Sequence, residues 1–160
     1  MGRLLAFATS VTWANTGTNS DTFSIQPADD YPCKLRKVVL GNQTEIAEAQ
    51  EETQRFRLAR LAATFTVGSG GAAVTGYALR EGDGTTGTPT VRANDTTIAT
   101  TSGEDASLED WGWNLRATPL VMEWSSEDAP TAKQGSGLVL QAPGTPADDV
   151  TLSITIIVEV

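Results

Sequence analysis

The last eleven residues alternate between two kinds of side chain, with one exception at Ile157. From Asp148 the chain reads D-D-V-T-L-S-I-T-I-I-V-E-V, with an apolar residue at every second position from Val150 to Val160. A repeat of two is the period of a β-strand with one buried and one solvated face, and it does not fit a helix. This segment is therefore predicted to be a strand clamped into a half-buried sheet, with Ile157 as an apolar side chain on its otherwise polar face.

Short apolar segments recur along the rest of the chain and are separated by residues that favour turns. Strands are predicted over residues 4–13, 22–26, 34–43, 54–67, 77–79, 90–100, 111–117, 120–124, 137–142 and 148–160. The segments between them, including the polar loop 14–21 and the acidic loop 102–110, are expected to be turns and loops. About eight main strands joined in this way predict an all-β fold, an antiparallel two-sheet sandwich of the jelly-roll type.

One segment has helical composition. The stretch from Thr44 to Thr53 offers an N-cap and helix-forming residues, and its length allows at most one short helix. In the following segment, 54–67, the apolar residues change parity, which predicts a bulge near Ala59 and Arg60. The run R-F-R-L-A-R-L-A-A also contains helix formers, so a helix through Arg60 is the competing interpretation.

Composition bounds the size and the chemistry of the protein. The chain has 160 residues, no histidine and one cysteine, which fits a single domain over residues 1–160. The missing histidine removes the usual general base and the Ser-His and Cys-His dyads, while the single Cys33 excludes an internal disulfide and a four-cysteine zinc site. We predict no catalytic, cofactor-binding or metal-binding residue and no enzyme, with Cys33 as a small buried hydrophobe.

Charge and hydropathy argue against nucleic acids and membranes as binding partners. The chain has 20 acidic and 11 basic residues and a net charge of −9, whereas nucleic acids and anionic membranes require a basic surface. No apolar run approaches the roughly 20 residues of a membrane-spanning helix, and the first residues do not resemble a secretory signal. The expectation is synthesis in the cytoplasm, with no binding to nucleic acid or membrane.

Acidic residues gather in predicted loops, at Asp29–Asp30, Asp83, Glu104–Asp105, Glu109–Asp110 and Asp148–Asp149. None of these segments has the every-second-residue ligand pattern of a calcium loop, so they are expected to be solvated charges. Two carboxylates at a suitable distance would serve a glycosidase, but exposed loops lack the burial that raises the pKa of a catalytic acid.

Four tryptophans and a group of arginines are candidates for contacts. Trp111, Trp113 and Trp124 each share a strand face with other apolar residues, which favours a core or a subunit interface, whereas Trp13 borders a polar loop and is expected to be exposed. The three arginines are expected to face the acidic stretch 45–52 and to form ion pairs between subunits or to a partner. They are Arg55, Arg57 and Arg60.

Several segments together resemble a known group of proteins. They are an early apolar strand, F-S-I-Q-P-A-D-D-Y-P-C-K-L-R-K-V-V-L-G-N-Q-T-E-I-A-E-A-Q-E-E-T-Q-R-F-R-L-A-R-L, a Gly-rich loop, a Trp-bearing strand and G-L-V-L-Q-A-P-G-T-P-A-D-D-V-T-L-S-I-T-I-I-V-E-V. The likeness is strongest in residues 27–61 and 137–160. The chain is similar to small β-sandwich, jelly-roll capsid decoration or cement proteins of tailed bacteriophages, which assemble as trimers on the outside of an icosahedral shell and reinforce it.

The resemblance implies a virion structural protein on the capsid exterior, whose partners are the major capsid protein and copies of itself, and which needs no cofactor. Its adhesive mechanism would use apolar edges and faces, with residues 1–12 as an N-terminal arm or edge strand that reaches neighbouring capsid subunits. The interface residues expected on this basis are Leu4, Leu5, Phe7, Trp13, Arg55, Arg57, Arg60 and Ile157.

Two other functions stay open at this point. The first is a receptor- or glycan-binding module of a tail fibre or tail tip, in which exposed aromatic side chains contact sugar. Such modules usually follow a long repetitive stalk, and this chain begins almost at once with a predicted strand. The second is a calcium-dependent or glycan-cleaving enzyme, whose activity would be lost when one acidic pair is replaced.

Overall fold

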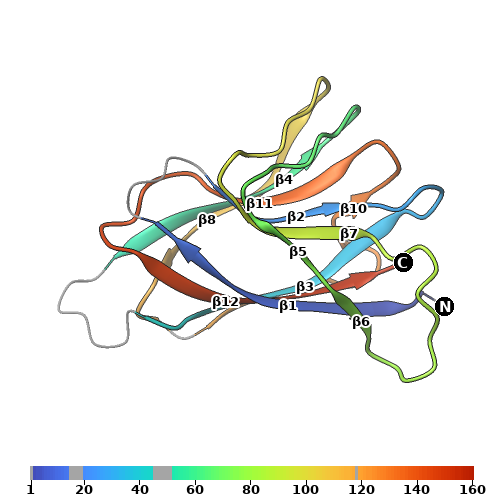
Figure 1. The fold of residues 1–160 in the computed structure, drawn as a ribbon, viewed down its shortest axis with the longest axis horizontal. Coiled ribbons are helices and arrows are strands. Elements are labelled where there is room, and N and C mark those ends of the chain that lie inside the picture. Colours follow the sequence, from blue (N-terminus) through green and yellow to red (C-terminus); the bar gives the residue numbers. More distant parts are fainter. Residues whose placement is uncertain (1, 15–19, 45–51, 118) are drawn as a thin grey trace.

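The protein is a sandwich of two antiparallel β-sheets (Figure 1), as the sequence predicts. The computed structural model describes residues 2–14, 20–44, 52–117 and 119–160, and within these ranges it contains strands and no helix. Sheet A contains β1 (Leu4–Trp13), β3 (Cys33–Asn42), β6 (Gly76–Ala78), β9 (Leu120–Glu123), β10 (Thr131–Ala132) and β12 (Val150–Glu159). Sheet B contains β2 (Ser20–Gln26), β4 (Thr53–Leu61), β5 (Ala72–Val74), β7 (Thr90–Asp95), β8 (Asp105–Asn114) and β11 (Gly137–Ala142).

The strand order is that of a jelly roll. Sheet A has the order β10-β3-β12-β1-β6, with β9 also paired to β3, and sheet B has the order β5-β7-β2-β11-β4-β8. Sheet A thus contains the series β1-β12-β3-β9, in which the first strand of the chain lies beside the last. Sheet B contains the series β2-β11-β4-β8, in which the second strand lies beside β11. This is the nesting of a jelly roll, which confirms the predicted fold.

Strand β12 lies at the centre of sheet A, between β1 and β3. Its side chains alternate between buried and half-buried along its whole length, as the period of two predicts. Cys33 on β3 is fully buried, and burial raises the pKa of its thiol to about 12, which confirms the expected buried hydrophobe. The core between the sheets is therefore built from every second residue of these strands.

Strand β4 buries side chains on both of its faces. Phe56 and Leu58 belong to the core between the sheets, whereas Ala59 and Leu61 belong to a second hydrophobic cluster on the outer side of sheet B. The apolar residues of β4 change parity because the first ones face the core between the sheets and the later ones face the second cluster. The competing interpretation, a helix through Arg60, is wrong. The pairing of β4 with β8 does shift between Leu58 and Ala59, but the additional residue, Leu108, lies on β8.

Several predicted boundaries are wrong. The acidic segment predicted as a loop forms the first half of β8, because its carboxylates lie opposite the arginines of β4 and opposite charges stabilise neighbouring strands. The polar loop 14–21 ends earlier than expected, since Ser20 and Asp21 belong to β2. The strand predicted over 90–100 ends at Asp95, after the left-handed backbone of Asn94 (φ 61°). The helix predicted over 44–53 falls mostly on residues 45–51, which lie outside the described residues.

The N-terminal segment does not form a free arm. Strand β1 pairs with β12 at every position from Leu4 to Trp13, and with β6 only from Leu5 to Phe7. Within the described residues, the part of β1 beyond Phe7 has no second strand beside it, so that this part is an edge. In this structure these residues form a paired strand, which is an edge only beyond Phe7.

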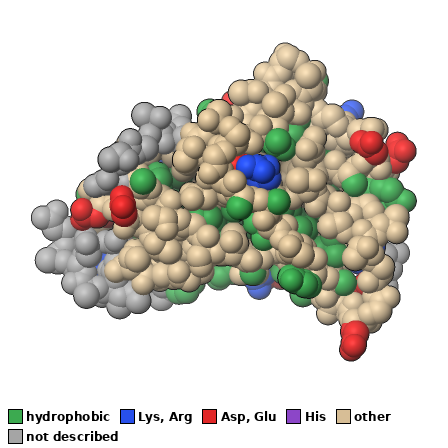
Figure 2. All heavy atoms as spheres, in the orientation of Figure 1, with side chains coloured by type: hydrophobic (Ala, Val, Ile, Leu, Met, Phe, Trp, Pro, Cys, Tyr) green, Lys and Arg blue, Asp and Glu red, His purple; other side chains and the backbone are tan. Residues whose placement is uncertain are grey.

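Strands β5 and β6 close one side of the sandwich. They are separated only by Thr75, yet β5 pairs with β7 of sheet B and β6 pairs with β1 of sheet A. Hydrophobic side chains gather on this side of the molecule, in the area where β1, β5 and β6 lie (Figure 2). A side chain at Gly76 would place its Cβ 2.4 Å from the ring of Phe7, so a glycine is required where the chain crosses between the sheets.

Candidate functional site: a groove on the outer face of sheet A

Three of the predicted interface residues are not available for contacts. Leu5, Phe7 and Trp13 are 1%, 2% and 4% exposed and point into the core between the sheets. The expectation that Trp13 is exposed is wrong, because Trp13 packs edge-on against Phe56 of the opposite sheet, with ring centroids 6.0 Å apart. The alternation of β1 places these side chains inside and leaves Leu4 on the outer face.

The predicted arginines are mostly used within the chain. Arg55 forms a two-pronged ion pair with Asp110, and Arg57 pairs with Asp105, all on the outer face of sheet B. These contacts join β4 to β8, whereas the acidic stretch 45–52 lies almost entirely outside the described residues. Arg60 lines a separate surface hollow of about 660 Å³ and forms no ion pair with any described residue.

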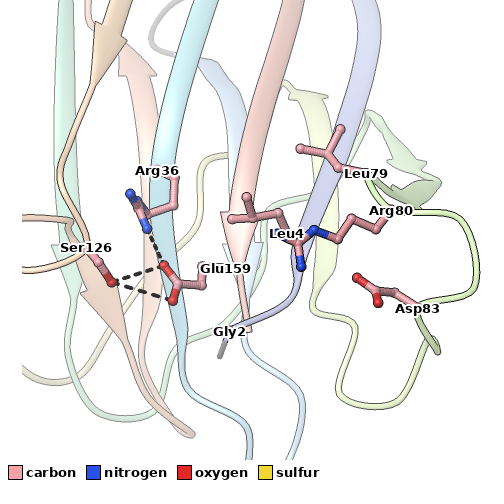
Figure 3. A pocket seen from close by; sticks show the side chains of 8 residues that line it. All are labelled: Gly2, Leu4, Arg36, Leu79, Arg80, Asp83, Ser126 and Glu159. Carbon is pink, nitrogen blue, oxygen red and sulfur yellow. Dashed lines mark hydrogen bonds and ion pairs between the residues drawn. The ribbon is translucent and has the colours of Figure 1, made fainter.

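Leu4 and Ile157 lie together on the outer face of sheet A. They line a groove of about 430 Å³, whose floor also contains Val39 and whose wall contains Leu79. The groove continues into a hollow of about 270 Å³ between Leu4, Leu79 and the end of β12 (Figure 3). Two predicted interface residues are thus brought together by strands β1 and β12, far apart in the sequence.

The groove belongs to a wider apolar strip that crosses sheet A. Ile157 is opposite Ala6 in the strand pairing, and Ala6 is opposite Tyr77 on β6, whose side chain is 70% exposed. In the next row, Val39 is opposite Val121 of β9, which is 53% exposed. Leu79, at the edge of the groove, is 52% exposed. Within the described residues no other element covers this strip, so the face is an uncovered sheet surface.

A β-bulge shapes the charged end of the groove. The pairing of β3 with β12 shifts between Lys37 and Leu35, which leaves Arg36 as the additional residue. Because of this bulge Arg36 reaches Glu159, which also accepts a hydrogen bond of 3.2 Å from Ser126 (Figure 3). Arg36 lowers the pKa of the Glu159 carboxyl by binding its charged form. The bulge thereby fixes a compact ion pair beside the apolar floor.

The charges along the groove balance. Its lining contains three cationic and three acidic side chains, namely Arg36, Lys37, Arg80, Asp83, Glu123 and Glu159. Arg36 and Lys37 are paired with Glu159 and Glu123. Arg80 extends towards Leu4 (Figure 3) and forms no ion pair with a described residue. On a chain with a net charge of −9, this neutral strip is where another surface can approach without repulsion between like charges.

The arrangement is suited to adhesion. No group of three or more potential metal-binding side chains occurs among the described residues. The same part of the chain has no helix of the length and hydropathy needed to span a bilayer. An apolar floor between fixed ion pairs offers a partner surface both apolar area to bury and charged groups that fix its position.

Sequence reasoning identified two residues of this site and missed the others. Val39 lies in the apolar run Val38-Val39-Leu40, where the sequence does not show which side chain faces outwards, because the bulge that turns Val39 outwards depends on pairing with β12. Arg36 and Arg80 carried no distinguishing pattern. Tyr77 and Leu79 did lie in a predicted short strand, and their alternation with small residues was the one available signal.

No protein-family model and no curated protein sequence matches the chain. One solved structure, of the Gx strain of infectious bursal disease virus, is similar at 14% sequence identity with a TM-score of 0.20. The match covers 100% of this chain and 42% of that chain, so this chain spans less than half the length of the viral protein. No conclusion about family or function rests on so low a score.

Proposed function

We propose that this protein is a structural component of a bacteriophage particle, which decorates and stabilises the capsid exterior by docking the groove face of sheet A onto the shell. The observation that carries the proposal is the apolar strip of Ile157, Leu4 and their neighbours on an uncovered sheet face. Exposed apolar strips of this kind mark protein contact sites in soluble proteins. The resemblance to cement proteins supplies the identity of the partner, the major capsid protein.

The jelly-roll fold agrees with this proposal and does not carry it alone. Jelly rolls serve both as viral capsid domains and as lectins, so the fold by itself leaves the sugar-binding alternative open. The positions of the tryptophans argue against that alternative, because Trp13 and Trp113 are buried and Trp111 is packed against Phe56. A sugar-stacking surface would need such side chains in solvent.

Attachment through several copies would make weak docking effective. One groove face is modest in size, but a homotrimer would present three such faces to a shell of repeated subunits. Linked contacts of this kind raise overall affinity without any new contact. The proposed mechanism is therefore adhesive, involves no bond making or breaking, and needs no cofactor.

The test compares two aspartate variants on the outer face of β12. Ile157→Asp places a charge on the apolar floor, whereas the control Thr151→Asp makes the same charge change on the same face of the same strand, about 20 Å away. We expect Ile157→Asp to weaken co-sedimentation with capsids assembled without this protein by about 30-fold or more, as loss of a central apolar contact does. Thr151→Asp is expected to bind like wild type.

Capsid rupture temperature provides the second measurement. Wild-type protein and Thr151→Asp should both raise it, and Ile157→Asp should not. If wild-type protein neither sediments with capsids nor changes the rupture temperature, the capsid function is wrong. If all three proteins bind equally, the function stands and the groove face is not the docking surface. Thermal unfolding of the free variants checks that each is folded.

A further inference from the structure

A row of polar side chains crosses the outer face of sheet B. In the strand pairing, Arg57 of β4 is opposite Gln141 of β11, Gln141 is opposite Asp21 of β2, and Asp21 is opposite Asp95 of β7. Both aspartates are 0% exposed. Two carboxylates that are neighbours in a sheet and shielded from water are costly unless each is compensated.

Two chain segments cover the aspartates. Residues 65–71 and 96–101, here called the cover, are bonded to each other, since Thr66 pairs with Thr100 and Ser69 with Thr97. The cover also supplies part of the second hydrophobic cluster: Phe65, Ala99 and the adjacent Val67 pack against Ala59, Leu61 and Val139 of the sheet. The aspartates are therefore buried by tertiary contacts on a sheet face that would otherwise be open to solvent.

Asp95 is fully compensated. Its Oδ1 accepts hydrogen bonds from Arg92 Nη2 (2.7 Å) and from the backbone N–H of Gly71 in the cover (2.9 Å). Its Oδ2 accepts a further bond from Arg92 Nε (3.0 Å). Asp95 is thus bound by a two-pronged arginine, the strongest arrangement for such a pair.

Asp21 is only half compensated. Its Oδ2 accepts a short bond of 2.6 Å from the backbone N–H of Ala99 in the cover. Its Oδ1 is buried and has no hydrogen-bond partner among the described residues. Burial, and to a smaller extent the charge of Asp95, raise the pKa of Asp21, and the hydrogen bonds of Ala99 and Gln141 lower it. The net result is a pKa of about 6.

Among the described residues, the elements around Asp21 offer no second cation. Strand β7 contributes Arg92, which is already bound to Asp95, and β11 contributes the neutral Gln141. Arg57 of β4 is engaged with Gln141 and with Asp105 of β8. The cover, residues 65–71 and 96–101, contains no ionisable side chain. The one arginine beside the two buried carboxylates is bound to Asp95, and a proton on Asp21 is the simplest charge that balances the second.

We propose that Asp21 binds one proton in the folded protein and, beside Asp95, forms a pH-sensitive latch that holds the cover closed when Asp21 is protonated and loosens it when Asp21 ionises. Ionised Asp21 would place a second negative charge in a site that water does not reach. Opening the cover relieves this charge by hydration, at the expense of the Ala99 and Gly71 contacts. The latch lies on the sheet opposite the groove and does not depend on the proposed function.

The direction of the pH effect follows from proton linkage. The pKa of Asp21 rises from 3.8 to about 6 on folding, so the folded protein binds more protons than the unfolded chain between these values. Stability from this group is therefore fully present below pH 4 and decreases as the pH rises to about 6. About two pKa units correspond to a change of about 100-fold in the unfolding equilibrium constant.

The test compares wild type with Asp21→Asn in urea unfolding at pH 4.5 and pH 7.5. Asparagine has the same shape, keeps an oxygen to accept the Ala99 N–H and carries no charge. We expect Asp21→Asn to lower the unfolding equilibrium constant by about 10- to 100-fold at pH 7.5 and to change it little at pH 4.5. The matched control Asp95→Asn should destabilise at both values, because it removes the partner of Arg92.

A local measurement on the wild-type protein keeps the proposal testable if a variant fails to fold. The carboxyl carbon of Asp21 should titrate near pH 6 in NMR, and the protection of the Ala99 amide against hydrogen exchange should fall over the same range. A midpoint below pH 4.5 would overturn the latch. An Asp21→Asn protein that is less stable than wild type at both pH values would overturn it as well.

Discussion

Replacing Phe56 by alanine is expected to lower the free energy of unfolding by about 3–5 kcal/mol, the usual cost of removing a fully buried phenylalanine. Phe56 is 0% exposed and lies at the centre of an aromatic cluster. Its ring centroid is 6.0 Å from that of Trp13, 6.3 Å from Trp111 and 6.1 Å from Trp113. Because Trp13 belongs to sheet A and the others to sheet B, the cavity would open between the two sheets.

Urea unfolding followed by tryptophan fluorescence measures this effect directly, since three of the four tryptophans surround Phe56. The control is Tyr77→Ala, which truncates an aromatic side chain that is 70% exposed and should change stability by about 0.5 kcal/mol or less. A loss below about 1 kcal/mol for Phe56→Ala, with unchanged fluorescence, would contradict the packing of the sandwich described here.

Replacing Arg92 by methionine is expected to destabilise the protein by about 3 kcal/mol at pH 7.5, because it leaves Asp95 as an unpaired buried charge beside Asp21. The side chain of Arg92 is 22% exposed while that of Asp95 is 1% exposed. Because the pair is partly open to solvent, the expected loss is near the lower limit of the about 3–5 kcal/mol that breaking a buried ion pair costs. Methionine keeps the apolar stem of the arginine, so the measured effect reports mainly the lost charge.

The loss should be specific to the buried pair. Arg55→Met is the matched control, since its ion pair with Asp110 lies on the surface and should contribute little. Urea unfolding of both variants at pH 7.5 measures the difference. A loss for Arg92→Met no larger than that for Arg55→Met would argue against a buried unpaired carboxylate.

The strands were largely predictable because their signal is local. Successive side chains of a strand point to opposite faces, so the alternation in residues 150–160 and 4–13 identifies β12 and β1 from neighbouring residues alone. The turn-forming residues between such segments then indicate an antiparallel sandwich. Strand β11 was likewise predicted with its full extent, 137–142.

The candidate site was predictable only in part. Ile157 was recognised as an apolar residue on the polar side of its strand, and Leu4 as an early apolar residue. Trp13 was misplaced because nothing in its own neighbourhood shows that Phe56, from the other sheet, lies against it. The acidic half of β8 was misplaced because its strand character depends on the arginines that β4 places opposite it.

The amino-acid sequence by itself determined the class of the fold, the parity of most strands and the absence of histidine chemistry, since these follow from residue type and from spacing along the chain. Only the tertiary structure decided which apolar residues remain on the surface and which acidic residues lose contact with water. Asp21 is a polar residue at the end of a polar segment, and its burial depends on Ala99 from a distant loop. Strand pairing and loop packing join residues far apart in sequence, and no local period encodes those contacts.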